Sequence, residues 1–293
     1  MDTLRDKKCL ITGAASGIGR ATAQAAALAG AELFLTDVNA DLLDAAVVEI
    51  RTTGGKVSFQ RALDISDFEA VKDFAKAIHE RAGSMDVVMN IAGISIWGTV
   101  ETLQHHHWKR CVDVNLMGPI HVIECFIPAM IRAGKGGHLV NVSSAAGLFG
   151  LPWHAAYSAS KFGLRGISEV LRFDLERYGI GVSLVCLGVV DTGFTKTVQI
   201  IGIDLASPEA QRYRAQFRKR AVSAETATAA IVRGVLQDEY LVFTSRDIRI
   251  GHWFQRVLGS VYERSMRRLS DRIERAARAA PALEASAFSP ERA

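Results

Sequence analysis

Short apolar, β-branched runs alternate over the first 245 residues with longer segments whose apolar positions recur at helical spacing. Seven strands are expected, at KCLITG (8–13), ELFLTD (32–37), VSFQRALD (57–64), MDVVMNIAG (85–93), GHLVNVSS (137–144), GVSLVCLG (181–188) and YLVFTS (240–245). Helices are expected over 17–30, 40–54, 67–82, 103–133, 155–179 and 222–237. This alternation is typical of βαβ units around a mainly parallel sheet, which binds ligands at the carboxyl ends of its strands.

Three segments depart from this alternation. Residues 193–221 are too long for a plain connection and follow a strand end, so we expect a substrate-binding lid there. Residues 246–278 place apolar side chains at helical spacing among arginines and predict one or two amphipathic helices that extend the 1–245 domain. Residues 279–293 are expected to be disordered.

Charge is unevenly distributed along the 293 residues. The body, 1–245, carries 25 Lys/Arg and 25 Asp/Glu, whereas 246–293 carries ten arginines and six acidic residues. A neutral body argues against nucleic acid as a partner, because phosphate binding needs a basic face. The sequence shows no apolar run expected to span a bilayer and no signal-peptide pattern, so we expect a cytoplasmic protein.

Metal and disulfide chemistry is not expected. The cysteines lie far apart without CxxC spacing, at positions 9, 111, 125 and 186. His105, His106 and His107 are consecutive, and consecutive helical residues face different directions, so they cannot chelate one ion together.

A glycine-rich turn follows the first strand. In TGAASGIGR, Gly13, Gly17 and Gly19 come directly after a strand and open a helix. Glycine allows a pyrophosphate to approach the backbone N–H groups at a helix N-terminus. Because this order of strand, turn and helix begins an alternating chain, it indicates a nucleotide site rather than an ordinary turn.

Asp37 ends the second strand, 18 residues beyond Gly19. A carboxylate there can bond the adenosine ribose hydroxyls and repels a 2′-phosphate, which favours NAD over NADP. Ser16 and Val38 supply no positive charge that would neutralise such a phosphate. A helix cap in this region is the other interpretation, with Asn39 as the capping residue.

Tyr157 stands four residues before Lys161 in the stretch AYSASKFG. Residues i and i+4 share one helix face, so the phenol and the ammonium are expected to point into the same space. A neighbouring cation stabilises a phenolate and lowers the phenol's pKa, which would make Tyr157 a usable acid or base. Taken alone, a solvated Tyr/Lys pair on the helix surface is the more common arrangement.

Five motifs, in order, resemble those of the classical short-chain dehydrogenase/reductase family: TGAASGIG (12–19), NIAG (90–93), VNVSS (140–144), YSASK (157–161) and CLGVVDT (186–192). The resemblance covers roughly residues 5–245. It implies a single-domain, Rossmann-like doubly wound α/β sheet with about seven strands and helices on both faces. It also implies hydride transfer between the nicotinamide of NAD(P) and a carbonyl or alcohol.

The resemblance assigns four catalytic residues. Tyr157 would be the general acid/base, and Lys161 would lower its pKa and hold the nicotinamide ribose. Ser144, rather than its neighbour Ser143, would bond the substrate oxygen. Asn115 in VDVNLMG would kink its helix and hold a water for proton relay, or would be a buried asparagine satisfied by backbone; both can be true in the family.

The resemblance also assigns the cofactor site, without a metal. Thr192 would bind the nicotinamide carboxamide, and Leu187 stands where the family usually has proline, which puts cofactor affinity in doubt. The implied cofactor-binding residues are Gly13, Ser16, Gly17, Ile18, Gly19, Asp37, Asp64, Ile65, Asn90, Ala92, Gly93, Tyr157, Lys161, Gly188, Val190 and Thr192.

The expected function is an NAD-dependent oxidoreductase acting on a secondary alcohol or ketone. The apolar segments 147–154 and 197–205 favour a lipophilic substrate resembling a steroid, retinoid or terpenoid, and His154 could touch it. One alternative is a 3-oxoacyl thioester reductase, against which Asp37 weighs because biosynthetic reduction normally uses NADPH. The other is a non-catalytic NAD-binding regulator, which would not need all four catalytic residues.

The resemblance further implies a homodimer or homotetramer built on the two long helices at 103–133 and 155–179. For 246–278, contact with a membrane surface, packing on a partner subunit and covering of the substrate cleft are all open. Packing against protein is the favoured expectation, because apolar stripes at helical spacing are mostly buried.

Overall fold

Seven parallel strands form the central sheet of the computed structural model, which describes residues 1–191, 198–203, 211–212, 215 and 221–278. The strands are β1 (Lys8–Thr12), β2 (Glu32–Asp37), β3 (Lys56–Ala62), β4 (Val87–Asn90), β6 (Gly137–Ser144), β7 (Ile180–Leu187) and β11 (Leu241–Phe243). Their order across the sheet is β11-β7-β6-β4-β1-β2-β3, and every adjacent pair is parallel. The predicted doubly wound α/β fold is confirmed.

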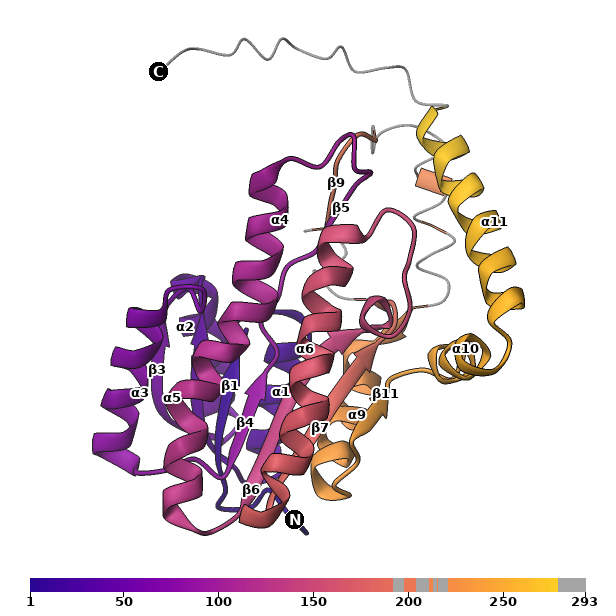
Figure 1. Cartoon of the computed structure of the whole chain (residues 1–293). Helices are drawn as coiled ribbons and strands as arrows, with labels where there is room; N and C mark the ends of the chain where they lie inside the picture. The colour runs from indigo at the N-terminus through magenta and orange to yellow at the C-terminus, as the bar shows by residue number, and fades with distance from the viewer. Residues whose placement is uncertain (192–197, 204–210, 213–214, 216–220, 279–293) are drawn as a thin grey trace.

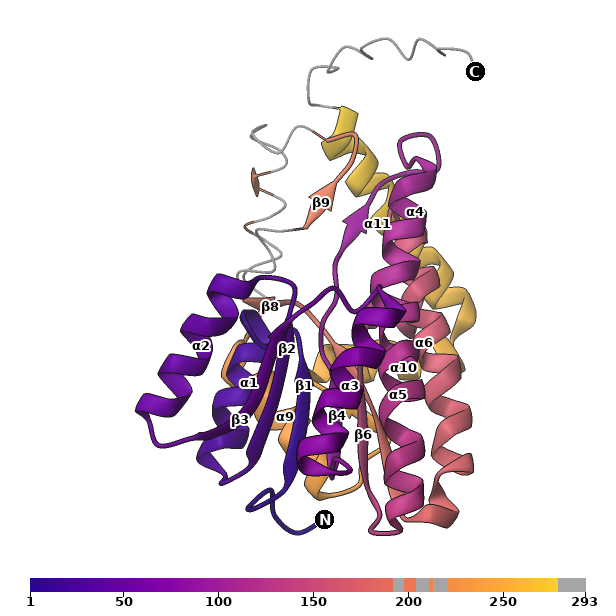
Figure 2. The ribbon, with the colours of Figure 1, turned by 90° about the vertical axis from the view of Figure 1, so that its left-hand side faces the viewer.

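Helices cover both faces of this sheet (Figures 1 and 2). One face carries α1 (Gly17–Leu28), α2 (Ala40–Thr52) and α9 (Ala224–Leu236), which share a buried cluster with the strands. The other face carries α3 (Phe68–Ala82), α5 (Gly118–Ala133) and α6 (Ala155–Asp174), packed around a second cluster. Burial on both faces explains why the inner strands, such as β1 and β4, are almost continuously apolar, whereas the edge strand β3 is not.

Side-chain caps fix where several helices begin. Asn39 accepts a hydrogen bond from the Leu42 N–H at the start of α2, 3.0 Å away, and Asp67 accepts one from the Ala70 N–H at the start of α3. Such a cap satisfies one of the backbone donors that a helix N-terminus leaves unpaired. The cap of α2 is therefore Asn39, which leaves Asp37 outside the helix.

The predicted helix over 103–133 is interrupted in the middle. It forms α4 (His105–Val112), a π-helical turn, η1 (Asp113–Met117), and then α5. A π turn inserts a residue into the i to i−4 ladder, and such turns are frequent at functional sites. The interruption places Asn115 at its centre, and sequence periodicity did not locate it.

The same stretch corrects one expectation about membranes. Together, α4, the π turn and α5 form a helical stretch of 29 residues, His105–Ala133, which is long and apolar enough to cross a bilayer by length and composition. The sequence had suggested that no such run exists. In the structure, Val122, Phe126, Ile127 and Met130 of this stretch are buried in the core under the sheet, which accounts for its apolar composition.

Smaller elements lie beyond the carboxyl ends of the strands. β5 (Ile96–Trp97) pairs with β9 (Gln199–Ile200), and β8 (Val190–Asp191) pairs with β10 (Val222–Ser223). β9 belongs to the expected lid, most of which lies outside the described residues. Residues 246–278 form two helices, α10 (Arg246–Val257) and α11 (Gly259–Arg278). The expected disordered tail, 279–293, also lies outside the described residues.

Candidate active site

Four of the expected catalytic side chains come together at the carboxyl edge of the sheet. Ser144 is the last residue of β6, Tyr157 and Lys161 lie in the first two turns of α6, and Asn115 lies in η1. Three of the four are buried, with exposed fractions of 8% for Tyr157, 4% for Lys161 and 0% for Asn115. A parallel sheet collects such residues because its strand ends meet at one edge.

Ser144, and not Ser143, faces the tyrosine. The Ser144 side chain lies next to the Tyr157 phenol, whose pKa it lowers, and its Oγ accepts the Ala146 N–H at 3.2 Å. The Ser143 Oγ instead donates to the Lys161 carbonyl at 3.1 Å, inside the sheet–helix interface. The alternation of side chains along β6 therefore gives the two serines separate roles.

Gly147 allows this close packing. A Cβ atom on Gly147 would lie 2.3 Å from the Ser143 Oγ and 2.7 Å from the Lys161 carbonyl oxygen. Both distances are shorter than van der Waals contact allows. A side chain at this position would push α6 away from β6, and with it the tyrosine away from Ser144.

Burial is the main influence on the pKa of Tyr157. It raises the pKa of this phenol to about 12, although the Ser144 side chain lowers it and the nearby Cys111 thiol adds to the rise. The expected lowering of the phenol's pKa by Lys161 stays a prediction. With a pKa of about 12, the phenol is protonated at neutral pH.

Lys161 is held by backbone rather than by the phenol. Its Nζ donates to the Val142 carbonyl at 2.9 Å and lies 5.8 Å from the centre of the Tyr157 ring. Burial lowers the pKa of the ammonium to about 8, with a small opposing effect from Cys111. A buried lysine with a pKa near 8 can give up or take a proton close to neutral pH.

Asn115 joins the turn after β4 to α6. Its Oδ1 accepts the Ile94 N–H at 2.8 Å, and its Nδ2 donates to the Ile94 carbonyl at 3.0 Å and to the Ser160 Oγ at 3.2 Å. A Cβ atom on Gly93 would lie 3.0 Å from the Asn115 Oδ1 and 3.4 Å from the Lys161 Nζ. The side-chain amide of Asn115 therefore has hydrogen-bond partners in the Ile94 backbone and in Ser160. It holds in place the segment beside the Lys161 Nζ.

The glycine-rich turn has the geometry that a pyrophosphate needs. Gly13 and Gly17 have positive φ angles, 71° and 51°. A Cβ on Gly13 would lie 2.8 Å from the Ala92 Cα, and one on Gly19 would lie 1.9 Å from the Gly13 carbonyl oxygen. These positions therefore require glycine.

The N-terminus of α1 fits an anionic group. Ser16 precedes α1 without a side-chain cap, and the first turn, which contains Ile18, has no acidic residue. The first backbone N–H groups of a helix lack intrahelical acceptors and carry partial positive charge. The chemistry of this turn therefore fits the pyrophosphate of a dinucleotide.

Asp37 lies beside this turn and is already hydrogen-bonded. Its carboxylate accepts the Ala15 N–H and the Asn39 N–H, each at 3.0 Å. Each carboxylate oxygen has a second lone pair, so both can still accept from ribose hydroxyls. Val38 beside it is 67% exposed, and its apolar side chain supplies no positive charge there.

Asp64 and Ile65 follow β3. The Asp64 carboxylate accepts the Ser66 N–H and Oγ–H and lies 3.3 Å from an Arg110 nitrogen. Burial raises the pKa of this carboxyl, but the Ser66 hydrogen bonds and the Arg110 charge outweigh it and hold the pKa below its usual range. Ile65 is buried against Gly118 at the start of α5.

Asn90 is the first of three buried polar residues that are joined by hydrogen bonds. Of these three, the sequence indicated only Asn90 as a site residue. Its Nδ2 donates to the Asn141 Oδ1 at 2.9 Å, and the Asn141 Nδ2 donates to the Ser168 Oγ at 3.0 Å. The Asn90 Oδ1 is buried and has no hydrogen-bond partner among the described residues. Asn141 lies in the VNVSS motif, so its polar character within an apolar strand was the available signal.

Thr12 is a second residue that the sequence analysis missed. Its Oγ1 accepts the N–H groups of Ile91 and Ala92, at 3.0 and 3.1 Å, and so ties the end of β1 to the segment after β4. It immediately precedes Gly13, in the motif that first indicated the nucleotide site.

The end of β7 carries the remaining cofactor-site residues. The Gly188 N–H donates to the Thr244 Oγ1 at 3.1 Å, and a Cβ at this position would lie 2.7 Å from Ile248 of α10. Val190 is buried and pairs with Val222. Leu187, in the place of the family's proline, packs against the core. Thr192 lies outside the described residues.

An apolar wall surrounds Tyr157. It combines side chains from β5, α4 and α6 with partly buried ones from the neighbouring loops: Ile94, Ile96, Trp97, Leu103, Trp108, Cys111, Ala146, Leu151, Ala156 and Ile201. His154 stacks on Trp97 with ring centres 4.2 Å apart, and burial lowers its pKa to about 4. The imidazole at this wall is therefore uncharged at neutral pH.

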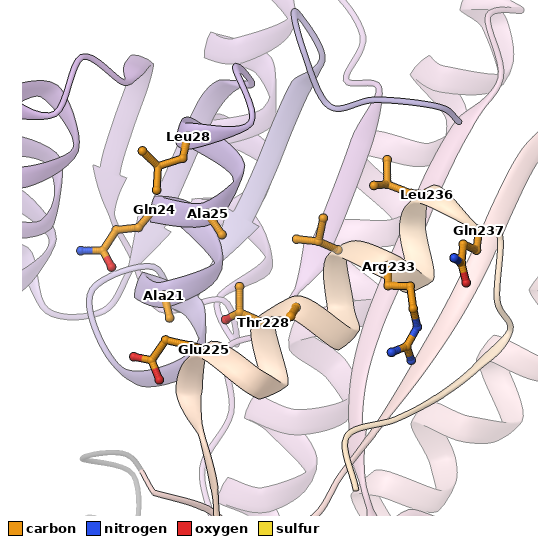
Figure 3. Close-up of a pocket in the computed structure, with 11 residues that line it drawn as sticks. Ala21, Gln24, Ala25, Leu28, Glu225, Thr228, Arg233, Leu236 and Gln237 are labelled. Atoms are coloured by element: carbon orange, nitrogen blue, oxygen red, sulfur yellow. The ribbon is translucent and has the colours of Figure 1, made fainter.

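A separate groove lies on the other face of the sheet. It has a volume of about 540 Å³ and runs between α1 and α9, with Leu28, Val232 and Leu236 among its lining residues (Figure 3). None of the expected site residues lines it. Among the residues that the structure describes, no three His, Cys, Asp or Glu side chains are grouped so that they could hold a metal ion.

Two curated relatives are similar to this chain. A putative oxidoreductase, SadH, of Mycobacterium tuberculosis is 34% identical over 267 residues, which cover 90% of this chain and 95% of the relative. A 3-oxoacyl-[acyl-carrier-protein] reductase, FabG, of Thermotoga maritima is 35% identical over 193 residues, covering 66% and 78%.

Solved structures agree with the fold. A short-chain dehydrogenase/reductase from Burkholderia phymatum in complex with NAD matches with a TM-score of 0.77 and 27% identity, covering 87% of this chain and 95% of its own. A metagenomic short-chain oxidoreductase in complex with NADP matches with a TM-score of 0.66 and 29% identity, covering 82% and 96%. The model of the family described as short chain dehydrogenase matches residues 7–200. With its glycine turn and its Ser144–Tyr157 pair built on this sheet, the chain belongs to the short-chain dehydrogenase family.

Proposed function

We propose that this protein is an NAD-dependent oxidoreductase that interconverts a lipophilic secondary alcohol and its ketone. The family membership makes it an oxidoreductase, and the nicotinamide of the bound cofactor supplies or accepts the hydride. The observation that carries the proposal is the placement of Ser144 beside the Tyr157 phenol, with Lys161 one helical turn beyond the tyrosine, at the strand edge that also holds the glycine turn.

The chain's own residues supply the proton and the polar contacts. Ser144 would hold the substrate oxygen, and Tyr157 would give its proton to that oxygen as a ketone is reduced. A phenol with a pKa of about 12 is protonated at neutral pH, so the geometry favours Tyr157 as the proton donor. Lys161, with a pKa of about 8, would exchange protons near neutral pH, and Asn115 holds the Ile94–Gly93 segment beside it.

Asp37 supports NAD as the cofactor. Its carboxylate is fixed at the end of β2 by the Ala15 and Asn39 N–H groups, where a 2′-phosphate would meet a negative charge.

A 3-oxoacyl thioester reductase is the second candidate. The 35% identity to the FabG reductase supports it, and the apolar wall would also accept an acyl chain. Asp37 weighs against it because biosynthetic reduction normally uses NADPH.

Self-association is part of the proposal. Phe162, Val170 and Phe173 are exposed on α6, at 39%, 58% and 61%, and Met117 of η1 is exposed at 36%. Large exposed apolar side chains gathered on a long helix are typical of an interface. We therefore propose a homodimer or homotetramer that buries this face of α6.

Ser144 and Ser143 give a matched test of the mechanism. Ser144→Ala should lower kcat/KM for the best alcohol of a panel by about 100-fold or more, because it removes the group that bonds the substrate oxygen. Ser143→Ala should lower it far less, because that hydroxyl bonds backbone inside the interface. Tyr157→Phe should lower it by about 100- to 10,000-fold. Cofactor reduction at 340 nm measures all three.

Calorimetry of NAD binding to the same variants provides the control. Ser144→Ala should bind NAD as the unaltered protein does, because Ser144 is not among the residues expected to bind the cofactor. Activity that survives Tyr157→Phe, or a larger loss in Ser143→Ala than in Ser144→Ala, would contradict the assigned roles. Binding of NAD with no turnover in the unaltered protein would favour the regulatory alternative.

Asp37→Asn should reduce the preference for NAD. This substitution removes the charge while keeping an oxygen that can accept an N–H bond, so the ratio of kcat/KM with NAD to that with NADP should fall by about tenfold or more. Asp41→Asn, in the first turn of α2, is the control and should leave the ratio unchanged. An unchanged ratio in Asp37→Asn would remove the argument for NAD.

A series of 2-alkanols of increasing length tests the lipophilic substrate. Each added methylene that enters the wall around Tyr157 should raise kcat/KM by about fourfold, which corresponds to about 0.8 kcal/mol per buried methylene. Trp97→Ala should weaken this dependence because it removes part of the wall. Faster turnover of small polyols than of long alkanols would show that the substrate is polar.

A further inference from the structure

The helix α10 presents an apolar face to solvent. Ile250, Trp253, Phe254 and Val257 recur at i, i+3, i+4 and i+7. Leu258, directly after α10, and Val261, in the first turn of α11, are exposed apolar residues that follow them in the chain. We call these six residues the apolar ridge. Their exposed fractions are 53%, 54%, 37%, 56%, 38% and 45% in chain order.

The opposite side of α10 packs against the domain. Ile248 and His252 are buried, and Ile248 packs with Leu148, Leu184 and Cys186. The sequence had favoured packing of the whole apolar stripe against protein. Among the residues that the structure describes, only one side of α10 is packed in this way, so the ridge is an exposed apolar surface of the kind that binds partners.

The charge around the ridge indicates what that partner is. Residues 246–278 contain nine arginines, no lysine and four acidic residues, whereas the body up to residue 245 is neutral. Arg249, Arg256, Arg264 and Arg268 are exposed beside or beyond the ridge. Two copies that met ridge to ridge about a two-fold axis would bring like charges together.

We propose that the apolar ridge docks the protein on a membrane surface that carries anionic lipids. Tryptophan, phenylalanine and aliphatic side chains would enter the boundary between headgroups and acyl chains, and the arginines would meet lipid phosphates. The charge complementarity between an arginine-rich helix pair and an anionic surface selects this partner over a second copy. The inference does not depend on which alcohol the enzyme uses.

The ridge is coupled to the active-site loop between Ser144 and Tyr157. The Tyr262 hydroxyl of α11 donates to the Gly150 carbonyl at 3.1 Å, and the rings of Phe149 and Tyr262 lie 6.5 Å apart. Gly251 of α10 also lies against Phe149. Figure 1 shows α10 next to β11 at the edge of the sheet, with α11 extending from it on the same side of the molecule. Docking would therefore bring the mouth of the site toward the bilayer.

Sedimentation of the full-length protein with sucrose-loaded vesicles tests the proposal. One set of vesicles contains phosphatidylcholine alone, and the other contains phosphatidylcholine with one-third phosphatidylglycerol. The protein should bind the anionic vesicles and should not bind the neutral ones, and added salt should weaken binding. Equal binding to both sets, or binding to neither, would overturn the proposal.

Variants with matched controls locate the surface. Trp253→Ser with Val257→Ser should weaken binding roughly tenfold or more. Arg256→Gln and Arg264→Gln should each weaken it about fivefold, which is the effect of about 1 kcal/mol per arginine. Leu28→Ser with Val48→Ser, which alters exposed apolar residues on α1 and α2, and Arg177→Gln, on the body, should leave binding unchanged.

Light scattering after gel filtration separates the alternative partner. All variants should keep the oligomeric mass and the circular dichroism of the unaltered protein. If the Trp253/Val257 double variant lowered the oligomeric mass while binding to anionic vesicles stayed unchanged, the ridge would be an interface between copies, and membrane docking through it would be excluded.

Discussion

Burial of Tyr157 and Lys161 against the end of β6 is the constraint on which the site depends. The first turns of α6 lie close to the strand because Gly147 leaves no side chain between them and because the Ser143 Oγ donates to the Lys161 carbonyl. This packing turns Ser144 toward the phenol and removes both titratable groups from water. Burial raises the pKa of the phenol to about 12 and lowers that of the ammonium to about 8, so each shifts toward its neutral form.

The remaining elements hold this arrangement from its other sides. The π turn directs Asn115 onto Ile94 and Ser160, which joins the segment after β4 to α6. Thr12 joins the same segment to β1, so the glycine turn and α6 are both hydrogen-bonded to the segment after β4. A displacement of this segment would therefore affect both the cofactor site and the residues that transfer the proton.

Much of this could be predicted from sequence because it depends on short-range patterns. Strands buried on both faces are continuously apolar, and Gly13 and Gly19 are required by contacts within their own turn and its neighbour. The rest depends on long-range packing. The π turn in 103–133 has no periodic signal, and the sign of the Tyr157 pKa shift follows from burial, which spacing alone does not determine. Likewise, the sequence pattern does not determine which side of α10 packs against the domain and which side is exposed.

Burial keeps Tyr157 protonated in the protein alone, and the titration of this phenol tests that directly. Tyrosinate absorbs near 295 nm, so the absorbance of the unaltered protein minus that of Tyr157→Phe, followed from pH 6 to about pH 10.5, isolates this phenol. We expect no rise in the difference over that range, because the pKa lies at about 12. A rise with a midpoint near pH 7 or 8 would contradict it and would show that Lys161 controls the phenol.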